Sequence, residues 1–116
     1  MDNEVLEIYL RHILDAVGRI EHYIARVRKE DFFADDSMVA AAVVRELEII
    51  GEAVSQVPSE YRSQYTSVPW REITDMRNRL IHGYFSVDYE IVWKTVAEDL
   101  SVLKQQILAM LKDLQK

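Results

Sequence analysis

The sequence lacks cysteine altogether and has only 3 glycines and 2 prolines in 116 residues. Without cysteine a disulfide framework and a thiolate-bound metal are excluded, and a reducing compartment is favoured. So few glycines and prolines leave few turns, which favours helices. No apolar run approaches the roughly 20 residues of a membrane-spanning helix, and the first residues are acidic where a signal peptide would be basic. We expect one all-α domain over residues 1–116, located in the cytoplasm.

The charge is unevenly distributed along the chain. The net charge is −6, and residues 1–58 account for all of it with 6 basic and 12 acidic side chains. Residues 59–116 carry 8 of each. A broad, electrostatically driven nucleic-acid surface is therefore not expected. Any contact with RNA should be local and should lie in the second half, around Arg71, Arg77 and Arg79, while the acidic first half is typical of a solvated face.

Apolar residues recur at helical spacing along nearly the whole chain. In the first half this periodicity predicts helices over residues 3–29 and 37–56. Asp35 or Asp36 is placed to cap the second of these, because a short carboxylate accepts the free N–H groups of a first turn. Gly51 inside that helix costs about 1 kcal/mol relative to alanine. A glycine at such a position predicts a tight crossing with another helix.

In the second half the turn-forming residues mark the boundaries. Pro58 should end the preceding helix and open a short helical turn that reaches Tyr65. Pro69 is suited to the first position of a third helix, and Gly83 is expected to end that helix in a left-handed conformation. Asp88 can cap a fourth helix. The expected architecture is a helical bundle with long helices at both ends of the sequence and a short one between them.

The end of the third helix carries the residues with the clearest chemistry. Histidine titrates near neutral pH, and arginine offers planar donors that suit the oxygens of a phosphodiester. Positions five apart lie about 140° apart on a regular helix, but the turn at Gly83 would let the ring of His82 swing back towards Arg77. Alone, so short a pattern is more typical of a capped helix end than of an active site. The stretch reads Arg77-Asn78-Arg79-Leu80-Ile81-His82-Gly83-Tyr84.

This stretch resembles the signature of HEPN ribonucleases, and it matches the longer pattern of HepT toxins: Arg, four residues, His, one residue, Tyr. Three further blocks are similar to HepT-like proteins in order and spacing. They are residues 45–53 (RELEIIGEA), residues 68–70 (VPW) and residues 88–93 (DYEIVW). The resemblance therefore extends over most of the chain and is more specific than the short motif.

The resemblance implies a HEPN-type up-and-down bundle of four to five helices that forms a homodimer, with both copies of the motif along a shared cleft. It implies metal-independent cleavage of RNA, in which Arg77 and His82 are catalytic and Asn78 supports them. Arg71 and Arg79 are then expected to contact RNA. No cofactor is indicated.

Tyr84 has a separate role by resemblance. HepT toxins pair with MntA-type minimal nucleotidyltransferases, antitoxins that neutralise them by adding AMP to this tyrosine. The bulk and negative charge of an adenylylated Tyr84 would oppose the binding of an RNA phosphate near the cleft. The implied function is therefore the endoribonuclease toxin of a toxin–antitoxin pair.

Two other functions are compatible with the sequence. HEPN domains also serve as non-catalytic partners of nucleotidyltransferases, and an acidic first half with a modest basic patch fits such a module. A dimeric structural bundle, in which the motif is only a helix cap, is the third reading. It is disfavoured because it gives no reason for the other matching blocks.

The remaining polar candidates are expected to be structural. Glu48 and Glu52 lie one helical turn apart, but no third ligand joins them at metal-binding spacing. A solvated helix face partly balanced by Arg45 is the simpler interpretation. His12 and His22 lie ten residues apart on the first helix and about 280° around it, so we expect both on the surface.

Overall fold

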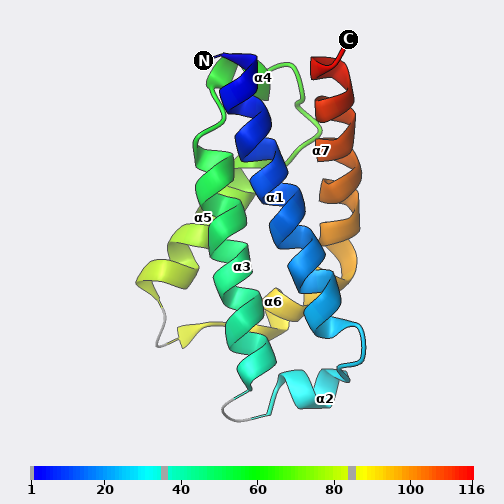
Figure 1. Ribbon diagram of the computed structural model, residues 1–116. Helices are drawn as coiled ribbons and strands as arrows, with labels where there is room; N and C mark the ends of the chain where they lie inside the picture. Colours follow the sequence, from blue (N-terminus) through cyan, green and yellow to red (C-terminus); the bar gives the residue numbers. More distant parts are fainter. Residues whose placement is uncertain (1, 35–36, 84–85) are drawn as a thin grey trace.

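The computed structural model describes residues 2–34, 37–83 and 86–116 of the chain. Throughout these residues the regular structure is helical, with no strand. Four long helical segments run alternately up and down, so that both termini lie at the same end (Figure 1). The expected all-α bundle is therefore confirmed, with one short helix in the connections that was not expected.

The helix α1 (Asn3–Ile24) forms the centre of the bundle, between α3 (Met38–Ser55) and α7 (Leu100–Leu114). Asp2 caps α1 by accepting the N–H of Glu4. The apolar face of α1 is buried in the core, with Tyr9 and Tyr23 only partly buried at its edges. Its buried members are Leu6, Leu10, Ile13, Ala16, Val17 and Ile20.

The predicted first helix is too long, because α1 ends at Ile24 rather than near residue 29. The chain turns there and forms the short helix α2 (Lys29–Phe32). The turn lets Phe32 enter the core, where its ring lies 5.0 Å from that of Trp93. Burial of this large aromatic side chain stabilises the turn more than a few further residues of exposed helix would.

The start of α3 is capped by Ser37, whose hydroxyl accepts the N–H of Ala40 at 3.1 Å. The caps predicted at Asp35 and Asp36 lie outside the described residues. At the other end, Pro58 precedes the short helix α4 (Ser59–Arg62), as expected. The guanidinium of Arg62 reaches back to carbonyls at the end of α3 and just beyond it. It donates to the carbonyl oxygens of Val54, Ser55 and Val57.

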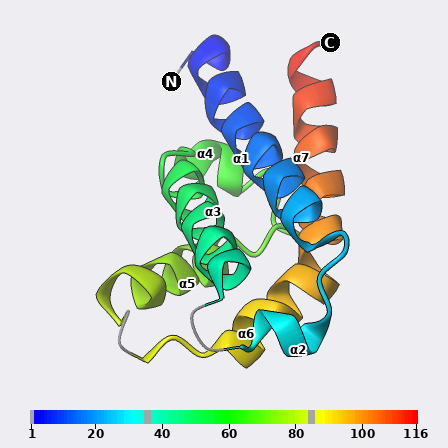
Figure 2. The ribbon, with the colours of Figure 1, turned by 60° about the horizontal axis from the view of Figure 1, so that its bottom comes forward.

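The helix α5 (Trp70–His82) packs against α3 and projects sideways from the bundle (Figure 2). Pro69 is its N-cap, one position before the place predicted for it. Gly83 ends α5, but its φ of −111° is not left-handed, so that prediction is wrong. Its N–H bonds to the carbonyl of Arg79 at 2.8 Å, and an added Cβ would lie only 2.9 Å from that oxygen. Close approach, and not a positive φ, favours glycine here.

The last segment is one continuous helix with a wider turn inside it. It consists of α6 (Tyr89–Lys94), the π-helical turn η2 (Thr95–Asp99) and α7. Asp88 caps α6 as predicted, accepting the N–H groups of Glu90 at 3.0 Å and Ile91 at 3.3 Å. Single π turns of this kind are often found beside functional sites.

Candidate functional site

Arg77 is positioned by the crossing of α5 over α3. A Cβ added to Gly51 would meet the Cβ of Arg77 and lie 2.6 Å from its Cγ. The absence of a side chain at Gly51 therefore gives the stem of Arg77 the space to lie against α3. The tight crossing predicted from this glycine is confirmed, and its partner is the arginine of the motif.

The head of Arg77 is held by a carboxylate of α3. Its Nη1 donates to Oε2 of Glu52 at 2.7 Å, the distance of a charge-assisted hydrogen bond. The arginine side chain is 20 % exposed, and its Nε is buried with no hydrogen-bond partner in the described part of the chain. One edge of the guanidinium is thus fixed by the protein while the side chain still reaches the surface.

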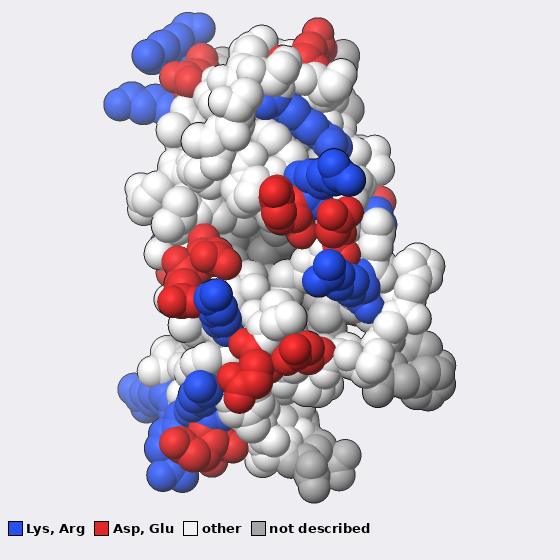
Figure 3. Space-filling model, turned by 180° about the vertical axis from the view of Figure 1, so that it is seen from behind, with Lys and Arg blue, Asp and Glu red and all other residues white. Residues whose placement is uncertain are grey.

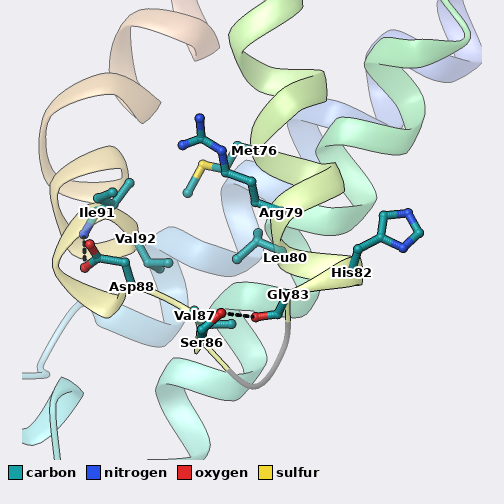
Figure 4. A pocket seen from close by; sticks show the side chains of 10 residues that line it. All are labelled: Met76, Arg79, Leu80, His82, Gly83, Ser86, Val87, Asp88, Ile91 and Val92. Atoms are coloured by element: carbon teal, nitrogen blue, oxygen red, sulfur yellow. Dashed lines mark hydrogen bonds between the residues drawn. The ribbon is translucent and has the colours of Figure 1, made fainter.

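His82 is the last residue of α5 and is exposed. Its ring points away from the adjoining pocket (Figure 4), and no hydrogen bond joins it to Arg77. Because α5 stays helical through His82, the two residues remain on different faces. The return of the ring towards Arg77, expected from the turn at Gly83, is not seen within one chain.

The other candidate residues of α5 are spread around its exposed surface, and Arg79 lies on the side towards α6. Asn78, Arg71 and Arg79 are all exposed. Arg71 makes only a long contact of 3.9 Å with Asp75, so its charge is largely available to solvent. Tyr84, the predicted modification site, lies outside the described residues.

A pocket of about 460 Å³ adjoins the C-terminal end of the motif. It lies between the end of α5 and the start of α6, with Leu80 and Val92 in its lining (Figure 4). Arg79 contributes to its polar edge, and His82 lines it with its ring directed away. Ser86 is hydrogen-bonded to the end of α5, because its N–H donates to the carbonyl of Gly83 at 2.8 Å.

Glu52 is the site residue that the sequence alone did not identify. The helical spacing predicts a solvated face that it shares with Glu48, and Arg45 does pair with Glu48 at 3.5 Å. Glu52 instead pairs with Arg77, which is 25 residues away in the sequence. Helical spacing reports neighbours on one helix and carries no signal for this contact between two helices.

The described residues contain no group of three or more His, Asp or Glu side chains that could hold a metal ion. His12 and His22 are exposed on α1, as expected. No helix in the described part of the chain is long and apolar enough to cross a membrane.

A family model described as Ribonuclease HepT-like matches residues 13–110. A Thermococcus cleftensis protein named a probable ribonuclease HepT is 44 % identical over 96 residues, which cover 83 % of this chain and 86 % of that protein. A protein of Caldanaerobacter subterraneus subsp. tengcongensis that is provisionally named an RNase is 43 % identical over 106 residues. The match covers 90 % of this chain and 92 % of that protein.

A longer relative comes from Methanocaldococcus jannaschii. It is named a gamma-glutamylcyclotransferase and, provisionally, an RNase, and it is 40 % identical over 111 residues. The match covers 96 % of this chain but spans only half the length of that relative. No solved structure matches the chain significantly.

Proposed function

Because the chain belongs to the HepT-like ribonuclease family, we propose that it is a metal-independent endoribonuclease in which Arg77 and His82 act on RNA. The observation that supports this most directly is the anchoring of Arg77. The stem of Arg77 lies in the space left by Gly51, and its guanidinium is held by Glu52. The helix that carries Arg77, α5, also presents His82 to solvent. A buried stem with a fixed head is an arrangement suited to binding a phosphate.

The active form in this proposal is a homodimer. Arg77 and His82 lie on different faces of α5, so one chain offers an incomplete site. A second copy facing the outer side of α5 would bring two sets of Arg77, Asn78 and His82 into one cleft. The exposed Ile81 lies on the same side of the helix and supplies apolar area for such a contact.

The reaction proposed is attack by the ribose 2′-OH on the adjacent phosphorus. The new O2′–P bond forms as the P–O5′ bond breaks, leaving a 2′,3′-cyclic phosphate and a 5′-hydroxyl. His82 takes the proton from the attacking hydroxyl or returns one to the leaving oxygen. Arg77 binds the non-bridging oxygens as their charge develops, and Asn78 supports the pair. DNA lacks the nucleophile and should be inert.

The biological setting proposed is a toxin–antitoxin pair. A cognate MntA-type nucleotidyltransferase would transfer AMP from ATP to the hydroxyl of Tyr84, with release of pyrophosphate. Tyr84 follows the helix end that carries His82, so the added phosphate would repel an incoming RNA. Incubating the chain with such an enzyme and ATP should add the mass of one AMP, and Tyr84→Phe should prevent the addition.

The decisive experiment is cleavage of a labelled RNA in EDTA by protein shown by mass to carry unmodified Tyr84. We expect cleavage by the unaltered chain, a loss of at least about 100-fold in His82→Ala and Arg77→Ala, and no cleavage of DNA. His22→Ala, which removes an exposed histidine of α1, is the matched control and should keep full activity. Equal cleavage by the unaltered chain and both motif variants would overturn the proposal.

A second candidate is a non-catalytic module that binds a nucleotidyltransferase. The net charge of −6, with 12 acidic and 6 basic side chains in residues 1–58, favours it, because such a chain has little positive surface to offer RNA. A dimer that binds the nucleotidyltransferase but leaves RNA intact, with or without the Tyr84→Phe change, would establish this function instead.

A further inference from the structure

A groove runs along the side of α5 that faces α6, η2 and α7. Its volume is about 580 Å³, and its floor is apolar. The rim adds two exposed apolar side chains, Ile91 at 46 % and Val102 at 55 %. The floor is formed by Leu47, Ile50, Ile73, Met76, Leu100 and Leu103.

Carboxylates lie on both sides of this groove. Glu72 and Asp75 line it from α5, and Asp99 lines it from the last position of η2. In the ranges that the structure describes, neither Glu72 nor Asp99 forms an ion pair, and Arg79 is the single cation in the lining. Figure 3 shows the molecule from behind, with a hollow that has both acidic and basic side chains around it.

The π turn forms part of the groove wall. Thr95 and Asp99, its first and last residues, both line the groove. The hydroxyl of Thr95 is already engaged, donating to the carbonyl of Ile91 at 2.8 Å. The extra residue of a π turn widens the helix locally and changes which side chains face a neighbour. Here the π turn ends at Asp99, whose carboxylate lies beside the apolar floor of the groove.

We propose that this groove binds a basic amphipathic helix of a partner protein. Leucine-like side chains on one face of such a helix would cover the apolar floor, and flanking lysines or arginines would meet the carboxylates. The 13 residues of α5 extend over about 20 Å, so three to four turns of a partner helix would fit alongside it.

The charges decide against the other two occupants. RNA phosphates would be repelled because Arg79 offsets only one of the three carboxylates, and they would leave the apolar floor exposed. In a symmetric dimer through this groove, the carboxylates of each rim would face the same carboxylates of the other copy. A basic partner is attracted by the rim and buries the floor.

The groove is separate from the catalytic arrangement proposed above. Arg77 contacts Gly51 and Glu52 of α3 and is not among the residues that line the groove, although Ile73, one turn before it, forms part of the floor. The groove proposal therefore does not depend on ribonuclease activity, and its test needs no cleavage assay.

The test uses the full chain and two synthetic helical peptides of about 14 residues, or four turns. One has leucines on one face and lysines on its flanks, and the other has glutamates in place of the lysines. Amide NMR spectra of the isotope-labelled chain would locate binding, and fluorescence anisotropy would measure Kd. We expect the lysine peptide to shift the amides of Glu72, Asp99 and Val102, and the glutamate peptide to bind at least about tenfold more weakly.

Matched variants separate the groove from the general acidity of the surface. The double variant Asp75→Asn/Asp99→Asn should raise the Kd of the lysine peptide about fivefold. The control Glu60→Gln/Glu98→Gln removes two carboxylates outside the groove and should change this Kd less than about twofold. Ile91→Ser with Val102→Ser should also weaken binding. All these positions are exposed, so circular dichroism should be unchanged.

Several results would overturn the proposal. One is a lysine peptide that shifts the amide signals of α1 instead of those of the groove. Another is a lysine peptide that binds no more tightly than the glutamate peptide. Another is a dimer of the chain that dissociates in the Ile91→Ser/Val102→Ser variant, which would make a second copy the occupant. Shifts of the groove amides by a short RNA would assign the face to nucleic acid.

Discussion

At the scale of single residues, the contact between Gly51 and Arg77 links packing to the proposed chemistry. The glycine is buried in α3, and its missing side chain is what allows Arg77 to lie across the helix. Glu52, the next residue, then holds the guanidinium at 2.7 Å. One short segment of α3 therefore sets both where the arginine stem lies and how its head is turned.

Gly51→Ala should destabilise the fold by about 1–3 kcal/mol, because the new methyl group would overlap the Cβ of Arg77 and force the helices apart. Gly18→Ala is the matched control. Gly18 is exposed in α1 with no heavy atom within 4 Å of an added Cβ, so alanine should stabilise the fold by up to about 1 kcal/mol. Urea denaturation measures both, and equal effects of the two substitutions would contradict the role given to the crossing.

Glu52→Gln should slow RNA cleavage about tenfold or more, because the guanidinium would lose the charged partner that orients it. The same change in an Arg77→Ala background should have no further effect if Glu52 acts only through the arginine. A double-variant measurement of kcat and KM tests this coupling. An equal loss in both backgrounds would show that Glu52 acts independently of Arg77.

At the scale of secondary-structure elements, the connection between α4 and α5 is tied to the end of the last helix. The Tyr65 hydroxyl donates to Oδ2 of Asp113 in α7 at 2.7 Å, and the Tyr65 carbonyl accepts from the indole of Trp70 at 3.0 Å. The hydrogen bond to Asp113, followed by partial burial, raises the pKa of Tyr65 above its ordinary value of 10.0. This loop thus depends on a protonated tyrosine.

Tyr65→Phe should lower the free energy of unfolding by about 0.5–1.5 kcal/mol at neutral pH, through loss of one hydrogen bond. A raised pKa in the folded state means that this contribution is complete below pH 10.0 and is lost as the pH rises through the folded pKa. The difference between the two proteins should therefore shrink above pH 10.0. Denaturation at several pH values measures it, and Asp113→Asn, which removes the carboxylate, should abolish this pH dependence.

At the scale of the whole molecule, the separation of Arg77 and His82 makes assembly part of the proposed function. The outer side of α5 carries His82 and Asn78 together with Ile81, which is 42 % exposed. An apolar side chain among polar ones on an exposed helix is suited to an interface between two copies. The molecule should therefore be active only where α5 meets a second α5.

Ile81→Glu should convert a dimer into a 13.6 kDa monomer and abolish RNA cleavage at the same time. Val5→Glu is the matched control, because Val5 is similarly exposed, at 40 %, but lies on α1. Sedimentation equilibrium and the cleavage assay would be run on the same samples. An Ile81→Glu protein that is monomeric yet fully active would exclude the shared cleft.

Much of the secondary structure could be predicted because local forces determine it. Helical periodicity located α1, α3 and the long segment from α6 to α7, and the short carboxylate of Asp88 marked the start of α6. The errors lie where distant parts of the chain compete with local preference. Burial of Phe32 ends α1 early, and contact with the Arg79 carbonyl, not a positive φ, makes residue 83 a glycine.

The sequence by itself determined the helical class, the family and the identity of the motif residues, because periodicity and spacing are properties of neighbouring positions. It also predicted a tight crossing at Gly51, since a glycine inside a helix leaves room for another helix. Only the tertiary structure decided that the crossing partner is Arg77, that Glu52 holds it, and that His82 stays apart from it. It alone joined Glu72, Asp75 and Asp99 around one apolar groove. The reason is physical: such contacts depend on how helices far apart in sequence pack, and no local spacing encodes that.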